Sequence, residues 1–444
     1  MGWVRGRRAG VLALGLDGVP AGLLRRLIDR GVMPNLAAFA RTGSLHQMAT
    51  TLPASSSVAW ASFVTGCQPG RHGVYGLTDL RPDSYDVSFT SSSELRAPAI
   101  WDRAAMSGRR SLAVNVPGTY PARKLRGTMV AGFVAPDLRR ACHPPVLTDR
   151  LTADGYRIDV DARRMPDDPE GFSSDLLGTL AARCRAILAL VAEERWDLAV
   201  AVVTETDRLH HFFYDRYERS EPQAVELFER VYRTVDDLIG RLLSSVAEGT
   251  RVMLLSDHGF CSVRAHVYLN AWLAEHGYLR ASSVAAVDRE TRAFALDAGR
   301  VYLNTTDQFP AGSFAMSDPD YEDLLAKLAQ GLGSIVDPDS GEPVIAQVHR
   351  RRDIYSGPQK RRGPHLVVVP RPGYELKGMM GRPMLGPSGP FAGTHTAADA
   401  FLALDRPVDP ARSPDGPLTI LDAAATVLRL LGADVADLDG RALL

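Results

Sequence analysis

The segment Val11-Leu12-Ala13-Leu14-Gly15-Leu16-Asp17-Gly18 sets the expected fold. A short apolar run that ends in an acid and a glycine is typical of a buried β-strand. The acid that follows such a strand lies at the carboxyl edge of the sheet, which is where open α/β folds bind their ligands. We therefore expect Asp17 to belong to a functional site.

The rest of the chain alternates short apolar runs with longer amphipathic ones, as βα units around a mostly parallel sheet do. Further strands are expected at 112–116, 197–203, 251–255, 365–369 and 401–404. Helices are expected at 21–30, 174–194, 222–245 and 418–431, where apolar residues recur at three- and four-residue spacing. The predicted fold class is α/β, a mostly parallel sheet with helices on both faces.

Between residues 261 and 363 this alternation becomes irregular. We interpret 261–363 as a cap or lid inserted into the core, with 1–260 and 364–444 as the two parts of the core. The alternative is that 261–363 is an ordinary long segment on the surface of the core. The run Arg350-Arg351-Arg352 suits recognition of an anionic part of a substrate, or else is a solvated surface.

Composition excludes several classes of protein. The 444 residues carry 51 Lys and Arg against 52 Asp and Glu, so no field attracts nucleic acid. No apolar stretch approaches the roughly 18 residues that span a bilayer, so no membrane association is expected. Cys67, Cys142, Cys184 and Cys261 form no CxxC pair, which predicts free thiols in a reducing compartment, the cytoplasm.

Asp and His residues follow several of the expected strands. They are Asp17, Asp207 with His210 and His211, Asp257 with His258, and His395. Convergent carboxylates repel one another unless cations neutralise them, so a metal site is the economical interpretation. Asp207 and His211 are four apart and would share one helix face. A hydrogen-bonded structural role is the commoner one for a single histidine, and we assign it to His46, His143, His266, His276 and His349.

Three serines, Ser55-Ser56-Ser57, precede a helix expected to contain Trp60 and Phe63. Serines in this position commonly cap the helix. A helix N-terminus also binds phosphate oxygens, and a hydroxyl there becomes a nucleophile once a metal lowers its pKa. The residues alone leave both roles open.

Together these segments resemble the alkaline phosphatase superfamily, most closely its type I phosphodiesterase/nucleotide pyrophosphatase family. The resemblance covers nearly the whole chain and rests on Leu16-Asp17-Gly18, Thr65-Gly66, Pro69-Gly70-Arg71-His72-Gly73, Asn115-Val116-Pro117-Gly118, Thr206-Asp207, Ser256-Asp257-His258-Gly259 and Gly393-Thr394-His395. It implies an alkaline-phosphatase-like core with two metal ions, usually zinc, bridged by a Ser or Thr nucleophile.

The family's ligand sets carry over by motif. The resemblance implies one ion held by Asp207, His211 and His395, and a second held by Asp17, Asp257 and His258. The family's nucleophile lies nine residues before the Thr of the Thr-Gly pair, which gives Ser56 as nucleophile and bridging ligand, with Ser55 and Ser57 as its neighbours.

The family's phosphoryl-binding asparagine has no counterpart at its usual place. Animal-type members carry it soon after the His-Gly pair, whereas Val74-Tyr75-Gly76-Leu77 contains none. Asn115, at the end of a strand, is the candidate replacement as a catalytic hydrogen-bond donor. A turn-forming role is its alternative.

The resemblance predicts phosphoryl transfer through a phosphoserine intermediate on a small phosphate ester or nucleotide-like substrate. Phosphodiesterase or nucleotide pyrophosphatase activity is the leading hypothesis. Phosphomonoesterase and phosphonate hydrolase activities are the alternatives, and a non-catalytic metal-binding protein is a remoter one. A sulfatase is disfavoured because Ser56-Ser57-Val58-Ala59-Trp60 lacks the Pro and Arg of that branch, and Trp60 would form an apolar wall beside the nucleophile. Histidine ligands favour Zn²⁺, with Mn²⁺ or Fe as alternatives.

Overall fold

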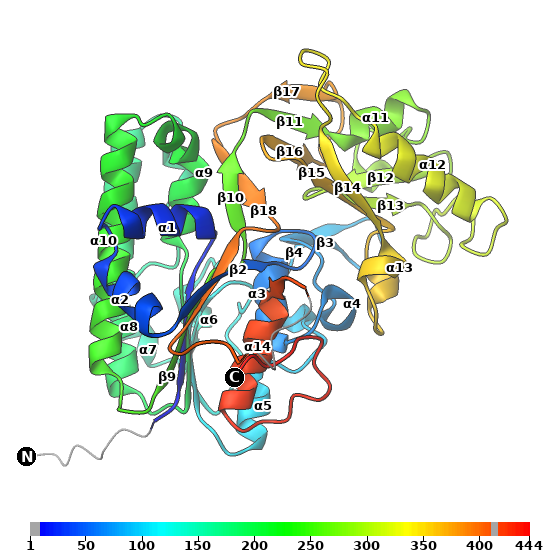
Figure 1. The fold of residues 1–444 in the computed structure, drawn as a ribbon. Helices are drawn as coiled ribbons and strands as arrows, with labels where there is room; N and C mark the ends of the chain where they lie inside the picture. The colour runs from blue at the N-terminus through cyan, green and yellow to red at the C-terminus, as the bar shows by residue number, and fades with distance from the viewer. Residues whose placement is uncertain (1–8, 410–415) are drawn as a thin grey trace, which may run out of the picture.

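A nine-stranded sheet forms the core of the computed structural model, which describes residues 9–409 and 416–444 (Figure 1). Its strands, in the order β20-β2-β19-β9-β1-β8-β5-β6-β7, are β1 (Val11–Leu16), β2 (Ser44–Ala49), β5 (Ser111–Val116), β6 (Gly127–Ala131), β7 (Cys142–His143), β8 (Leu198–Val203), β9 (Arg251–Leu255), β19 (Ala400–Leu404) and β20 (Leu418–Thr419). Strands β9, β1, β8, β5 and β6 run parallel, and β19 joins β9 antiparallel. The predicted α/β class is confirmed.

Helices cover both faces of this sheet (Figure 1). One face carries α1 (Ala21–Asp29), α2 (Pro34–Thr42), α8 (Pro169–Glu193), α9 (Glu205–Glu218) and α10 (Pro222–Ser245), and the other carries α3 (Ser56–Thr65), α5 (Ile100–Met106) and α14 (Ile420–Leu430). Successive β1 side chains point to opposite faces, so Leu12, Leu14 and Leu16 join one apolar core while Val11 and Ala13 join the other. Strand β1 is therefore packed on both sides, as its uninterrupted apolar sequence requires.

Shorter elements connect these layers. They are α4 (Pro69–His72), β3 (Thr78–Leu80), β4 (Val87–Phe89), η1 (Ser92–Glu94), α6 (Leu138–Ala141), α7 (Leu147–Ala153) and η2 (Ala162–Arg164). No helix within the two described ranges is long and apolar enough to cross a bilayer.

A second lobe with its own apolar core lies beside the carboxyl edge of the sheet (Figure 1). It contains β11 (Ala265–Tyr268), α11 (Leu269–Glu275), η3 (Val284–Ala286), β12 (Ala293–Leu296), β13 (Arg300–Leu303), α12 (Tyr321–Gly333), β14 (Ile345–Arg350), α13 (Arg351–Ile354), η4 (Lys360–Arg362), β15 (Leu366–Pro370), β16 (Tyr374–Lys377) and β17 (Leu385–Pro387). The antiparallel pair of β10 (Gly259–Ser262) and β18 (Gly393–Thr396) joins this lobe to the core.

The strand expected at 365–369 forms, but not in the central sheet. As β15 it pairs antiparallel with β13 and β14 of the second lobe. Its apolar sequence fits a buried strand in either sheet, so the sequence pattern did not identify its partners. Because β15, β16 and β17 all follow residue 363, we propose that the inserted cap extends beyond 363 to β18.

Candidate metal centre and active site

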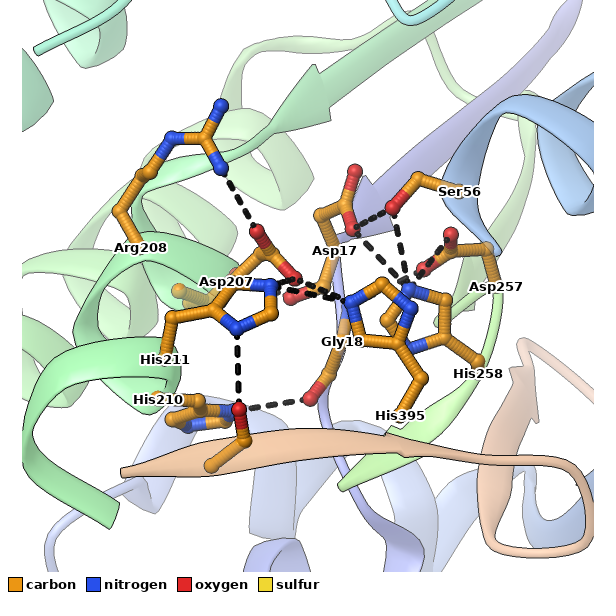
Figure 2. A network of polar contacts seen from close by, with 12 residues as sticks. Asp17, Gly18, Ser56, Asp207, Arg208, His210, His211, Asp257, His258 and His395 are labelled. Atoms are coloured by element: carbon orange, nitrogen blue, oxygen red, sulfur yellow. Dashed lines mark hydrogen bonds and ion pairs between the residues drawn. The ribbon is translucent and has the colours of Figure 1, made fainter. Parts of the chain in front are cut away.

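The register of the sheet gathers the predicted acids at one edge. In the parallel strands β9, β1 and β8, Leu16 lies opposite Val203 and Gly15 lies opposite Leu255. The residues that follow these strands therefore emerge side by side, and they include Asp17, Asp257 with His258, and the start of α9. Helix α9 presents Asp207 and His211, and β18 brings in His395 opposite Phe260 of β10. Figure 2 shows that all six predicted ligands converge with Ser56.

Each of the three carboxylates has one oxygen held by a donor of the protein. Trp60 Nε1 donates to Asp17 Oδ2 (3.0 Å), the Gly18 amide donates to Asp257 Oδ1 (3.0 Å), and Arg208 Nη1 donates to Asp207 Oδ2 (3.2 Å). The second oxygens of Asp207 and Asp257 are buried and accept no hydrogen bond. Buried carboxylate oxygens without donors are costly, and their position fits ligands of a cation.

The three imidazoles are oriented in a matching way. The Nδ1 atoms of His211, His258 and His395 lie 3.0, 3.0 and 3.4 Å from the carbonyl oxygens of Gly393, Gly259 and Ala54. Because a carbonyl oxygen only accepts, each Nδ1 carries the proton and each Nε2 presents a lone pair. All three Nε2 atoms are turned towards the carboxylates, as ligands of a metal would be (Figure 2).

The separations within the first group match one metal ion. His211 Nε2 and His395 Nε2 lie 3.4 and 3.3 Å from Asp207 Oδ1, and they lie 3.1 Å from each other. Ligands at 2.0–2.1 Å from a tetrahedral zinc ion are about 3.3 Å apart. The three atoms therefore fit one face of a zinc coordination tetrahedron.

The second group adjoins the first and includes the serine. His258 Nε2 lies 3.3 Å from Asp257 Oδ2 and 3.7 Å from Asp17 Oδ1. Ser56 Oγ lies 3.1 Å from His258 Nε2 and 3.2 Å from Asp17 Oδ1. His258 also lies within 4.8 Å of the ligand atoms of Asp207 and His395, so the two groups form one continuous cluster. The donor set fits two neighbouring metal ions.

Burial perturbs the acids and bases of this cluster. It raises the pKa of Asp257 to about 7 and lowers the pKa of His211 to about 4. Burial and the charges of Asp257 and Asp207 raise the pKa of Asp17 well above its ordinary value. Burial alone would raise the pKa of Asp207, but His211, His395 and Arg208 hold it well below the ordinary value. The cluster thus contains mutually repelling acids, which divalent cations would neutralise.

Of the three serines, Ser56 is the one that the structure brings to the cluster. It is the first residue of α3, whereas the preceding Ser55 is extended and its side chain caps nothing. Ser57 is buried and lines an apolar cavity beside α3.

The expectation that Trp60 forms a wall beside the nucleophile is wrong. Its ring is completely buried behind the site, and a Cβ on Gly15 would lie only 2.2 Å from the ring. Trp60 follows Ser56 by one helical turn, so its Nε1 reaches Asp17 while Ser56 reaches the other oxygen of the same carboxylate. Trp60 therefore orients the predicted ligand Asp17, and its four-residue spacing from Ser56 was the sequence signal for this contact.

The structure does not support Asn115 as a catalytic donor. Its side chain is fully buried and Nδ2 donates to Val202 O (2.9 Å) and Thr204 Oγ1 (3.1 Å). Both amide hydrogens are therefore used within the protein. With φ at 60°, Asn115 occupies the left-handed region that asparagine tolerates, at the irregularity where β5 shifts its register against β6, so a local backbone role explains it.

Two ion pairs support α9 and were not identified from the sequence. Asp159 accepts from Nε and Nη2 of Arg208 (3.0 and 2.7 Å), which fixes the guanidinium that holds Asp207. Arg183 is completely buried and pairs with Glu205 at 3.0 Å. These partners are distant in sequence, and no local pattern connects them.

Comparisons with known proteins agree with this geometry. A profile described as "Type I phosphodiesterase / nucleotide pyrophosphatase" matches residues 11–397. The chain belongs to this family. No curated protein matches it in sequence.

Solved structures share the fold of this family member at low sequence identity. Phosphonoacetate hydrolase from Sinorhizobium meliloti, in complex with phosphonoformate, has a TM-score of 0.67 and 17% identity, with 96% of each chain covered. An inactive form of murine ectonucleotide pyrophosphatase/phosphodiesterase 5, in complex with AMP, has a TM-score of 0.60 and 13% identity, with 98% of this chain and 97% of the other covered. As a member of the family, the chain is a phosphoryl-transfer hydrolase.

Replacing Trp60 by Phe should weaken metal binding about 10- to 100-fold, the usual effect of losing a group that orients a ligand. Phe keeps most of the buried ring but cannot donate to Asp17 Oδ2. Competition with a chromogenic chelator measures the affinity. The matched control is Trp272→Phe, which removes a buried indole from the second lobe. Equal affinities for the two variants would contradict the assignment.

Proposed function

We propose that this hydrolase cleaves phosphodiester or phosphoanhydride bonds of small molecules through a phosphoserine on Ser56. The position of Ser56 Oγ supports this most directly. It contacts Asp17 Oδ1 and His258 Nε2 of one ligand group, and the group of Asp207, His211 and His395 lies beyond them. A hydroxyl so placed can attack a phosphorus atom that lies over both groups.

The two ligand groups support a cofactor of two divalent ions. Asp207, His211 and His395 would hold one ion and Asp17, Asp257, His258 and Ser56 the other. Such ions lower the pKa of hydroxyl groups and water and neutralise charge on the transferred phosphoryl group. Three imidazole ligands favour Zn²⁺ over harder ions, with Mn²⁺ or Fe as alternatives.

The reaction then needs two in-line displacements. In the first, Ser56 Oγ gives up its proton and forms a bond to phosphorus as the bond to the leaving oxygen breaks, and the leaving group departs on the opposite side and takes up a proton from solvent. In the second, water attacks the phosphoserine, so that the phosphate product departs and the Ser56 hydroxyl is restored. The N–H groups at the start of α3 have no partner within the helix. They can therefore bind a phosphoryl oxygen during both displacements.

The charges around the ligand groups favour a diester over a monoester. A cavity beside α3 is lined by Ser57, Val74, Met129 and Arg123, but neither Ser56 nor any of the six predicted ligands lines it, so it does not bear on this choice. A monoester carries nearly one more negative charge at the phosphoryl group and needs a further cation there. The guanidinium nearest the ligands, Arg208, is already bonded to Asp159 and Asp207.

We place the enzyme in the cytoplasm, since all four of its cysteines are free thiols.

The protein purified without chelator and reconstituted with Zn²⁺ should hold two equivalents of metal per chain by elemental analysis. His211→Ala should lower this number towards one, because it removes a ligand of one group only. Wild-type protein with well under one equivalent of Zn, Mn and Fe combined after reconstitution would contradict the two-metal proposal.

Ser56→Ala should lower kcat by several orders of magnitude, since it removes the covalent nucleophile. Most of the metal affinity should remain, because the carboxylates and imidazoles are unchanged. Ser55→Ala is the matched control, as its side chain contacts neither ligand group. If Ser56→Ala stays near wild type and Ser55→Ala or Ser57→Ala is inactive, the nucleophile has been misassigned.

Diesters should be hydrolysed faster than monoesters, and sulfate esters hardly at all. A monoester brings nearly one more negative charge, which needs a further cationic group in the site. The measurement is kcat/KM for bis-aryl and mono-aryl phosphates with the same leaving group, together with the aryl sulfate. A tenfold preference for the monoester would reassign the enzyme as a phosphomonoesterase.

A further inference from the structure

A basic residue of the cap is connected to the first ligand group through the ring of Phe391. Lys377 is the last residue of β16, and its Nζ lies 5.9 Å from the ring centroid of Phe391. The Phe391 ring in turn lies 5.1 Å from the ring of His211. Lys377, Phe391 and His211 therefore form a continuous row from the cap to the candidate metal centre.

The ammonium group is fixed by charged partners on the cap. Nζ lies 2.7 Å from Glu375 Oε1, and Glu375 Oε2 lies 2.9 Å from His266 Nε2 on the neighbouring strand β11. Both oxygens of Glu375 therefore have a nitrogen close by, while the ammonium has three donors and Glu375 Oε1 uses one of them. The side chain of Lys377 is only 18% exposed, so the charge is held in place rather than free in solvent.

The geometry of in-line transfer determines which part of a substrate lies along the row of Lys377, Phe391 and His211. Ser56 lies against Asp17 and His258, so the leaving oxygen departs on the side of Asp207, His211 and His395. Phe391 packs against His211 on that side, and Lys377 follows it. The apolar cavity at Ser57, in contrast, lies beside the nucleophile helix.

We propose that Lys377 is a specificity-determining residue that binds an anionic group carried by the leaving group. The inference rests on the proposed function and narrows its substrate class to diesters or anhydrides whose leaving group bears a carboxylate or phosphate. Phe391 provides the surface over which this leaving group extends, and Glu375 with His266 positions the ammonium.

The arginine run expected to recognise an anionic part of the substrate is engaged within the cap instead. Arg350 and Arg352 both pair with Glu322, at 3.2 and 3.1 Å, and Arg351 donates to the carbonyl of Arg361. Lys377 is thus the cation next to Phe391, whose ring packs against His211, and it lies beyond the predicted end of the cap at 363.

The test compares two diesters that differ only in the leaving group. Phenyl 4-nitrophenyl phosphate releases a phenol without a further charge, and phenyl 3-carboxy-4-nitrophenyl phosphate releases one with a carboxylate. The wild type should prefer the carboxylate-bearing diester in kcat/KM. Lys377→Met should reduce this preference about ten- to a hundredfold, as expected for loss of a charge-assisted hydrogen bond, and Lys377→Arg should retain most of it.

Lys360→Met removes an exposed lysine of the same cap and is the matched control, with the preference kept. The preference of the wild type should also fall as salt is raised from about 0.02 to 0.5 M, since a partly exposed charge is screened. A preference that Lys377→Met leaves intact, or that is insensitive to salt in the wild type, overturns the inference. A wild type that hydrolyses neither diester but does hydrolyse the matching monoester overturns the proposed function instead.

Discussion

Mutual repulsion of three buried carboxylates is the constraint on which this site depends. The parallel register of β9, β1 and β8 forces Asp17, Asp207 and Asp257 to one edge of the sheet, where burial deprives them of water. Such an arrangement is unfavourable unless positive charge compensates it. The protein supplies one guanidinium, from Arg208, and leaves the rest of the compensation to metal ions.

The protein controls this arrangement through the atoms that face away from the centre of the cluster. An indole, a guanidinium and a backbone amide each occupy one carboxylate oxygen, and backbone carbonyls orient the three imidazoles. Each predicted ligand consequently turns a single defined atom towards the centre of the cluster, which gathers side chains from four separate segments. Ser56 lies at the Asp17 and His258 end of this cluster, and the packing of Phe391 against His211 lies at the other end.

The local sequence pattern predicted those helices and strands that a short segment of the chain determines by itself. The strand Val11–Leu16 and the helix Pro222–Ser245 have the predicted bounds, because an apolar run and a regular amphipathic period each define an element without reference to the rest of the chain. The six predicted ligands follow such strands or belong to recognisable motifs, and the structure brings their side chains together (Figure 2). Ser56 came from a spacing within a family motif and not from the residues alone.

What sequence reasoning missed depends on partners far apart in the chain. The contribution of Asp159 depends on its ion pair with Arg208. The position of the strand Leu366–Pro370 depends on its pairing with β13 and β14. Trp60 was misread because apolar character suggested a surface for substrate, whereas its one polar atom determines its role. Asn115 was misinterpreted because its side-chain amide donates to Val202 O and Thr204 Oγ1 and so has no hydrogen left for a substrate.

The contact between Gly15 and Trp60 links the evolution of the strand to that of the helix. A glycine inside a strand is unfavourable on its own, yet the ring of Trp60 fills the space that any larger side chain at position 15 would need. A change at position 15 would displace the indole, and with it the hydrogen bond to Asp17. The two positions are therefore coadapted. A larger residue can replace Gly15 during evolution only after Trp60 has been replaced.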